Sequence, residues 1–211
     1  KLFPSHVFDG LKGKATVEYS HNNSYKGKDG EEFVDDATEN ALKSNSAEVN
    51  ASQVTVAIKF AENLKKSKFR FWYKVSSKYD YLKINEETGK SISGEIDWTE
   101  KGLTVTGGET VTLSYVKDSS GKSGSDCIWL KDFTLEQLYG LTISVKDEAG
   151  KAVSGATIVL TDANKNSISG ENGVYSLTAG TYAYTVSAFG YKSESGTITV
   201  SSEDIAKDIT L

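Results

Sequence analysis

The chain has 211 residues, a formal net charge of −5 and 37% hydrophobic residues. Lysines and glutamates are interspersed and form no basic stripe, which argues against nucleic acid as a partner. No run approaches the roughly 20 apolar residues that span a bilayer, so we expect no membrane insertion. A single cysteine excludes an internal disulfide, and 19 glycines suit short strands joined by tight turns.

The first half of the chain is patterned as strands joined by long turns. Residues 1–13 predict a first strand and loop centred on Val7 and Phe8, and Pro4 lies outside every candidate strand. Residues 20–40 are polar and glycine-rich, which predicts a long surface loop. Apolar and polar residues then alternate, as in half-buried strands. The alternating runs are Ser52–Phe60, Lys68–Val75, Tyr81–Ile84, Ser91–Ile96, Gly102–Thr106 and Thr110–Val116.

Within these runs, alternation separates the face that we expect to be buried from the wet face. In the first run, Val54, Val56 and Ile58 share a face. In the second, the apolar face carries Phe69, Phe71, Tyr73 and Val75, and the opposite face carries Arg70, Trp72 and Lys74. The later run Cys127–Leu135 is apolar on both faces, which is typical of a central strand covered on both sides.

The pattern changes near residue 139, after which strands are shorter and turns recur about every 8–14 residues, as in an all-β sandwich. The predicted strands are Leu141–Lys146, Ala156–Leu160, Val174–Leu177, Tyr182–Ser187, Gly196–Val200 and Ile205–Leu211. Tyr182, Tyr184 and Val186 share the face that we expect to be buried. We therefore expect an all-β protein with two domains, residues 1–138 and 139–211.

Four segments of the first domain form an ordered set of motifs. They are Phe71–Ser77 (FWYKVSS), Tyr79–Lys83 (YDYLK), Ile92–Trp98 (ISGEIDW) and Gly124–Trp129 (GSDCIW). Together they resemble jelly-roll modules of secreted or surface-attached bacterial proteins, which are similar to MAM-type and concanavalin-like sandwiches and to cleaved-adhesin domains. Residues 85–90 depart from that pattern. The resemblance implies a jelly-roll-like β-sandwich.

Short motifs also mark the second domain. They are Val145–Asp147 (VKD), Gly150–Thr157 (GKAVSGAT), Gly173–Tyr175 (GVY), Ala179–Tyr182 (AGTY) and Phe189–Lys192 (FGYK). They resemble the carboxypeptidase-regulatory-like and CnaB-type families, which implies a seven-stranded, prealbumin-like (Ig-like) sandwich used as a stalk or spacer. Some CnaB-type domains carry a lysine amide crosslink between their first and last strands. Here alternation points Lys146 outward and puts Asp208 out of phase with the apolar residues beside it, so we expect no such crosslink.

Catalysis is not expected. Only two histidines are present, His6 and His21, and neither lies near a serine- or cysteine-centred motif. Cys127 lies in an apolar strand, so we expect a buried structural thiol. We predict no catalytic residues and no required cofactor.

Carbohydrate binding is the sharpest functional hypothesis, because sugar rings stack on exposed aromatic side chains. The candidate ligand-binding residues are Arg70, Trp72, Lys74, Tyr79, Tyr81 and Trp98. The alternative is that Trp72, Trp98 and Trp129 belong to the core between the sheets, which large aromatics usually favour.

A structural calcium ion is a second hypothesis, weighed against ordinary solvated carboxylates. Calcium takes about six to eight oxygen ligands. The candidate ligands, which converge only if the first and last strands of the domain pair, are Asp9, Asp35, Asp36, Asp126 and Asp132.

We expect a non-catalytic module pair of a secreted or cell-surface, extracellular bacterial protein, with an adhesion or binding role and a spacer role. Its partners would be a glycan or protein of the cell surface or matrix and the other domains of a longer parent protein, since the chain has neither an initiator Met nor a signal peptide. The alternative is a carbohydrate-binding accessory region of a secreted glycan-degrading enzyme. A third interpretation is a protease-associated domain that binds protein substrates.

Overall fold

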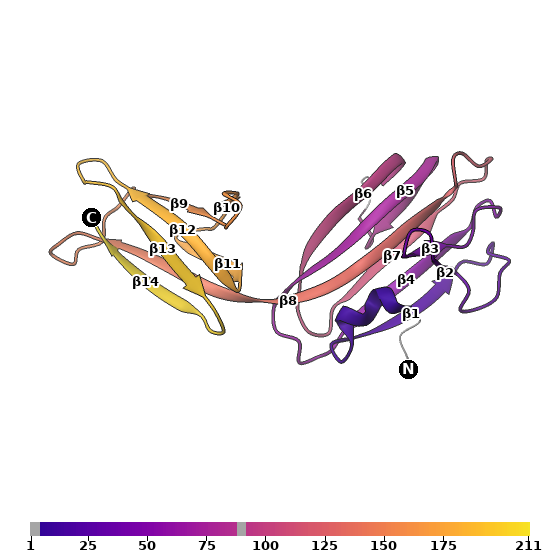
Figure 1. Ribbon diagram of the computed structural model, residues 1–211, viewed down its shortest axis with the longest axis horizontal. Coiled ribbons are helices and arrows are strands. Elements are labelled where there is room, and N and C mark those ends of the chain that lie inside the picture. The colour runs from indigo at the N-terminus through magenta and orange to yellow at the C-terminus, as the bar shows by residue number, and fades with distance from the viewer. Residues whose placement is uncertain (1–4, 88–91) are drawn as a thin grey trace. The chain divides into compact units, whose positions relative to one another are not determined.

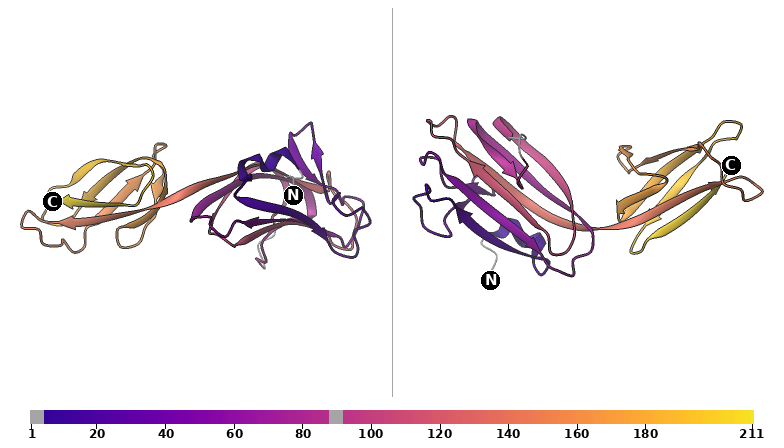
Figure 2. Two further views of the ribbon diagram at one scale, coloured as in Figure 1. Left: turned by 90° about the horizontal axis from the view of Figure 1, so that it is seen from below. Right: turned by 180° about the vertical axis from the view of Figure 1, so that it is seen from behind.

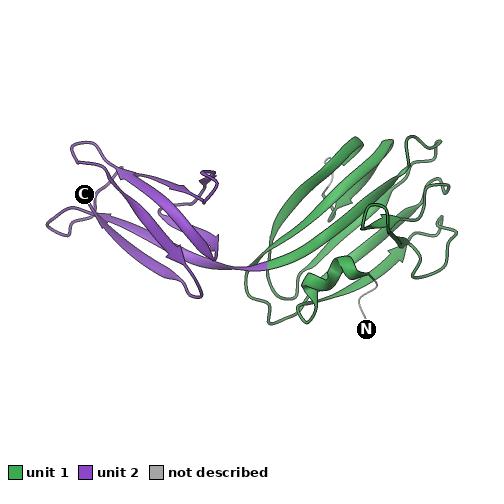
Figure 3. Ribbon diagram, in the orientation of Figure 1, with its two compact units in different colours: residues 1–135 green, residues 136–211 purple. Residues whose placement is uncertain are grey.

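The computed structural model describes residues 5–87 and 92–211, so Pro4, Ser91 and part of the departing segment 85–90 lie outside the described residues. The chain forms two compact units, Lys1–Leu135 and Glu136–Leu211 (Figure 3). The described elements are strands except for one short 3-10 helix, η1 (His6–Leu11). The predicted all-β sandwich class is confirmed.

Unit 1 is a mostly antiparallel sandwich. Its strands are β1 (Ala15–His21), β2 (Phe33–Asp36), β3 (Ala41–Ser44), β4 (Gln53–Phe60), β5 (Ser67–Ile84), β6 (Ile92–Val105), β7 (Thr110–Val116) and the first part of β8 (Cys127–Lys146). They lie in the order β1-β4-β7-β5-β8-β3-β2, with β6 paired to β5 (Figures 1 and 2). The central position predicted for Cys127–Leu135 is confirmed, because β8 lies between β5 and β3 and Cys127–Leu130 are buried on both faces.

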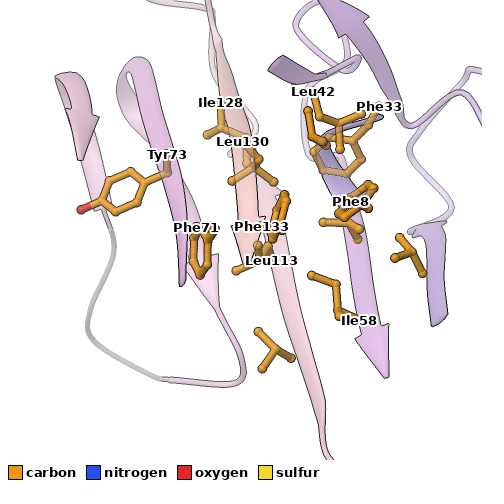
Figure 4. Packing of buried hydrophobic residues seen from close by; sticks show 14 of the residues in the cluster. Phe8, Phe33, Leu42, Ile58, Phe71, Tyr73, Leu113, Ile128, Leu130 and Phe133 are labelled. Carbon is orange, nitrogen blue, oxygen red and sulfur yellow. The ribbon is translucent and has the colours of Figure 1, made fainter. Parts of the chain in front are cut away.

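The core of unit 1 is built by the predicted alternation. Every second side chain is buried in β4 and in residues 67–75 of β5, including Val54, Ile58 and Phe71. Phe133 of β8 is 1% exposed and stacks between segments distant in sequence. Its ring centroid lies 4.7 Å from that of Phe8 and 5.5 Å from that of Phe71 (Figure 4). Helix η1 therefore closes the core with an aromatic side chain.

Two predictions for the N-terminal region are wrong. Val7 and Phe8 lie in η1 and not in a strand, because the Ser5 hydroxyl accepts the backbone N–H of Val7 and the apolar residues recur at helical spacing up to Leu11. Residues 20–40 are not all surface loop. They contain β2, which pairs with β3, and the buried side chain of Tyr25.

The predicted strands Ser91–Ile96 and Gly102–Thr106 belong to one strand, β6, as far as the described residues show. The pairing of β6 with β5 shifts register between Tyr73 and Val75, so an irregularity interrupts the pattern midway. Such a bulge breaks strict alternation without ending the strand, which made one strand look like two.

Unit 2 has a separate core. Its strands are the second part of β8, β9 (Thr157–Thr161), β10 (Ser167–Ile168), β11 (Val174–Thr178), β12 (Gly180–Ser187), β13 (Glu194–Val200) and β14 (Ile205–Thr210). β11 pairs antiparallel and β14 parallel with β8, while β10-β9-β12-β13 form the facing sheet. Tyr182, Tyr184 and Val186 are buried, which confirms the predicted inner face.

Candidate binding face

All three tryptophans of the chain lie outside the core that fills unit 1. Since Phe71 and Tyr73 point into that core, Trp72 and Lys74 project from the opposite, outer face of β5. The same outer face continues over β6, β8, β3 and β2. We name it the tryptophan face and define it by Asp36, Glu39, Lys43, Trp72, Lys74, Trp98, Trp129 and Lys131.

Trp129 of β8 anchors the tryptophan face. It is 6% exposed and packs with Cys127 in a small cluster separate from the main core. Its indole Nε1 donates a hydrogen bond of 2.9 Å to Asp36, and this bond lowers the pKa of the Asp36 carboxyl. The ammonium groups of Lys43 and Lys74 lie 5.5 and 5.1 Å from the ring centroid. The ring is therefore held at both its polar edge and its face.

Trp98 of β6 packs against the Trp129 cluster and is half-buried. Its Nε1 donates to Glu39 at 3.2 Å, and the other oxygen of Glu39 accepts a 2.7 Å hydrogen bond from Lys74. The Lys74 bond is the main cause that lowers the pKa of Glu39, and Glu39 in turn raises the pKa of Lys74. The Lys131 ammonium lies 3.9 Å from the Trp98 ring centroid.

Three of the six predicted ligand residues, Trp72, Lys74 and Trp98, belong to this face, and Arg70 lies on the same side of β5 as Trp72. Trp72 is half-buried and pairs across from Glu100 of β6, whose carboxylate lies 3.2 Å from Arg70 Nε. Tyr79 and Tyr81 lie further along β5, where Tyr81 pairs with β7. They are not brought to the tryptophans by any described contact.

The alternative places the tryptophans in the core between the sheets. None of them is in the cluster that fills unit 1, although Trp129 is buried by its neighbours on the outer face. The core aromatics are phenylalanines and tyrosines such as Phe69, Phe71 and Tyr115, and only the tyrosines among them carry a polar atom to satisfy.

The five predicted calcium ligands lie in separate settings. Exposed Asp9 pairs with Lys12 at 2.9 Å. Asp35 accepts a 2.5 Å hydrogen bond from the hydroxyl of Ser5. Its neighbour on the same strand, Asp36, accepts the hydrogen bond from Trp129 instead. Asp126 is completely buried beside Lys117.

Asp132 has a conformational role. Its backbone φ is 54°, in the left-handed region. Before Asp132 the core side chains of β8 are at even positions, Ile128 and Leu130, and after it the core side chain is at an odd position, Phe133. A single left-handed residue of this kind produces a β-bulge, and short polar residues tolerate it best.

A different group of acidic residues gathers around a histidine. The ligand atoms of His21, Asp29 and Glu32 lie within 4.8 Å of one another, and no other such group of three occurs in residues 5–87 and 92–211. His21 Nε2 lies 2.9 Å from Asp29, and its Nδ1 lies 2.9 Å from the carbonyl oxygen of Asn22. The Asp29 bond, followed by the Asn22 bond, raises the pKa of His21. These residues span a stretch without periodicity, so alternation gave no signal for them.

A second polar cluster is completely buried. Lys117 lies between the carboxylates of Asp80 and Asp126, and all three side chains are 0–1% exposed. Tyr115 donates a 2.6 Å hydrogen bond to Asp126. No site was predicted at Lys117, and Asp126 was predicted as a calcium ligand instead.

The described contacts do not bring the two histidines and the cysteine together. His6 Nε2 lies 3.0 Å from Asn40, and His21 contacts Asp29. Cys127 is fully buried, and desolvation raises its thiol pKa to about 12. No described hydrogen bond joins either histidine to that thiol, which would stay protonated at neutral pH.

Residues 140–211 match the family described as the carboxypeptidase regulatory-like domain, in agreement with the fold of unit 2. The match covers the C-terminal third of the chain and therefore classifies unit 2 alone. No curated protein was found to match the chain. Among the described residues, no helix is long and apolar enough to cross a bilayer.

Solved structures show remote similarity. The K1 cleaved adhesin domain of Lys-gingipain from Porphyromonas gingivalis W83 is 10% identical over 62% of this chain and 95% of that chain, with a TM-score of 0.35. The structure of TmCBM61 in complex with β-1,4-galactotriose is 15% identical over 62% of this chain and 93% of its own, with a TM-score of 0.32. The adhesin domain of Epf from Streptococcus pyogenes is 9% identical over 92% of both chains, with a TM-score of 0.30. Scores this low do not by themselves establish a common fold.

Proposed function

We propose that the chain is a non-catalytic segment of a secreted or cell-surface protein, in which unit 1 binds a glycan and unit 2 is a structural spacer. The observation that carries the proposal is the placement of all three tryptophans on one outer face of unit 1. Surfaces that recognise ligands are enriched in aromatic residues and arginine, and side chains on strands are held more precisely than those on loops.

The charges on the tryptophan face favour a particular class of glycan. Lys43, Lys74 and Lys131 lie over the tryptophan rings, while Asp36 and Glu39 hold the indole N–H groups. A sugar that carries a carboxylate would pair with these ammonium groups while its ring contacts the partly exposed Trp72 or Trp98. We therefore expect acidic polysaccharides, such as those with uronic acid units, to bind more tightly than neutral ones.

The spacer role of unit 2 is supported by its closed core and its stiff turns. Asp147 accepts the backbone N–H groups of Ala149 and Lys151. Asp162 accepts those of Asn164 and Asn166 in the same way. Aspartates that satisfy the backbone of a hairpin restrict its conformations, as a spacer requires.

Intrinsic tryptophan fluorescence offers a direct test, because every tryptophan lies in unit 1. A glycan array followed by fluorescence titration should show acidic polysaccharides quenching or shifting the signal. Trp98→Ala and Trp72→Ala should each weaken binding by about tenfold or more, as expected for central aromatic contacts. Phe189→Ala, at a fully exposed aromatic position in unit 2, is the matched control and should bind normally.

Neutral and acidic glycans that all fail to bind or to change the fluorescence would overturn the glycan proposal. Binding that survives both tryptophan substitutions would place the ligand elsewhere. Binding of a protein from the cell surface or matrix, lost on the same substitutions, would keep the face and replace the ligand class.

A further inference from the structure

The buried lysine cluster of unit 1 brings an amine and two carboxyl groups into direct contact. Lys117 follows β7, Asp80 lies in β5, and Asp126 directly precedes β8. Lys117 Nζ lies 3.1 Å from Asp80 and also contacts Asp126. The side chains are 0%, 1% and 0% exposed, so bulk water does not separate them.

If all three groups were ionised, the folded state would be destabilised. Each buried charge loses several kcal/mol of solvation, and one lysine cannot neutralise two carboxylates. Two carboxyl groups that share a site ionise in turn, so one of them keeps a proton. The cluster is then neutral, with one ammonium group, one carboxylate and one carboxylic acid.

Hydrogen bonds identify which carboxyl group is ionised. Asp80 accepts the backbone N–H of Asp118 at 2.8 Å and the hydroxyl of Ser77 at 3.3 Å. Burial alone would raise the pKa of Asp80, but the backbone N–H of Asp118, a hydrogen bond with Asp126 and the charge of Lys117 together lower it. Burial raises the pKa of Asp126, even though two donors oppose it. The proton therefore resides on Asp126, and Asp80 is the anion.

We propose that Lys117 and Asp126 are joined by an intramolecular amide bond that forms spontaneously in the folded protein. Asp80 would serve as the proton shuttle, and the Tyr115 hydroxyl would stabilise the negative charge that develops on Asp126 Oδ1. A nucleophile, an acyl group, a base and an oxyanion donor are the parts that acyl transfer requires.

The reaction balances without a co-reactant. The Lys117 ammonium gives a proton to the Asp80 carboxylate, and the neutral amine attacks Cγ of the protonated Asp126. One C–N bond forms, and Tyr115 donates its hydrogen bond to the oxygen of the tetrahedral intermediate. The Cγ–Oδ2 bond of Asp126 then breaks, and the second proton of the nitrogen passes through Asp80 to the departing hydroxyl group, which leaves as water. Asp80 retains the first proton and ends protonated. No electron is transferred to or from the cluster.

Unit 2 contains an internal control. Lys146 Nζ lies 2.6 Å from Asp208, but these side chains are 40% and 63% exposed. Water solvates both side chains there, so we expect no amide bond between them. Contact alone is therefore insufficient for amide formation. Burial and the additional groups around Lys117 make the difference.

Mass spectrometry of the denatured, full chain tests the proposal. The expected mass is lower than the sequence mass by one water. Trypsin cannot cleave at an acylated lysine but still cleaves after Lys122, so the digest should contain Gly102–Lys122 linked to Ser123–Lys131. A mass equal to that of the sequence would overturn the proposal, as would a water loss that maps to any other pair of peptides.

Variants separate the roles. Lys117→Arg and Asp126→Ala should show the full mass, and Lys146→Arg should keep the water deficit. Asp80→Asn leaves the reacting pair in place, so a folded Asp80→Asn protein should show the full mass. A crosslink that still forms in that variant would refute the shuttle role of Asp80. The result for the unsubstituted chain does not depend on whether any variant folds, nor on whether unit 1 binds a glycan.

Discussion

Phe133→Ala should destabilise unit 1 strongly, because this side chain joins η1 to β5 through a stack of rings. Its ring contacts those of Phe8, Phe69 and Phe71 at centroid distances of 4.7, 5.9 and 5.5 Å. Truncating a buried phenylalanine costs about 3–5 kcal/mol in lost transfer energy and cavity formation. For a unit of this size, each kcal/mol lowers the melting temperature by roughly 3–5 °C. We expect the melting temperature to fall by about 10–25 °C.

The assay uses two signals. Each unit has its own hydrophobic cluster, so calorimetry should resolve two transitions, and tryptophan fluorescence should follow unit 1 only. Phe133→Ala should shift the fluorescence-detected transition and leave the other in place. Phe189→Ala removes the same atoms from a fully exposed position in unit 2 and should change stability by less than about 0.5 kcal/mol. A loss below about 1 kcal/mol for Phe133→Ala, or an equal shift of both transitions, would refute the reasoning.

Three further experiments test local features. Because the pKa of His21 is raised, its charged contact stabilises the fold fully below the ordinary value of about 6.5 and is lost as pH rises through the raised value. The difference in urea midpoint between the unsubstituted chain and His21→Gln should therefore shrink from pH 5 to pH 9, and a constant difference would contradict this. Gly173→Ala should lower the free energy of unfolding clearly more than Gly150→Ala. Both glycines have φ near 80°, which costs an alanine about 1–2 kcal/mol. Only at Gly173 would the new Cβ also lie 2.4 Å from a backbone oxygen. Equal losses in chemical denaturation would argue against that contact. A double-mutant cycle on Lys146→Ala and Asp208→Ala should give a coupling of only about 0–1 kcal/mol, as exposed pairs do, and a larger value would contradict the exposure of the pair.

Alternation predicted the parts of the fold in which one strand face is buried. The inner faces of β4, β5 and β12 follow from period two, and the all-apolar run Cys127–Leu130 lies in a central strand. In these elements one physical cause, the burial of alternate side chains, determines both the pattern and the structure.

Prediction failed where a second cause competed with alternation. η1 is favoured by the hydrogen bond between Ser5 and the backbone, and the pairing irregularity of β6 interrupted the pattern of a continuous strand. The cluster around Lys117 was not predictable, because its members are 37 and 9 residues apart in sequence and only strand order brings them together.

The tryptophan face shows why the rule that large aromatics belong to the core, which the phenylalanines follow, does not hold for the tryptophans of this chain. An indole N–H must find an acceptor when it is buried. Trp129 and Trp98 find theirs in the carboxylates Asp36 and Glu39, which cannot be buried without cations. Lys74 supplies that positive charge to Glu39 and also lies over the Trp129 ring. The indole therefore requires the carboxylate, and the carboxylate requires the lysine. Such a chain of requirements can be met at the outer face of a sheet, where water solvates the remaining charge, and the same arrangement leaves aromatic edges beside ammonium groups for a ligand to contact.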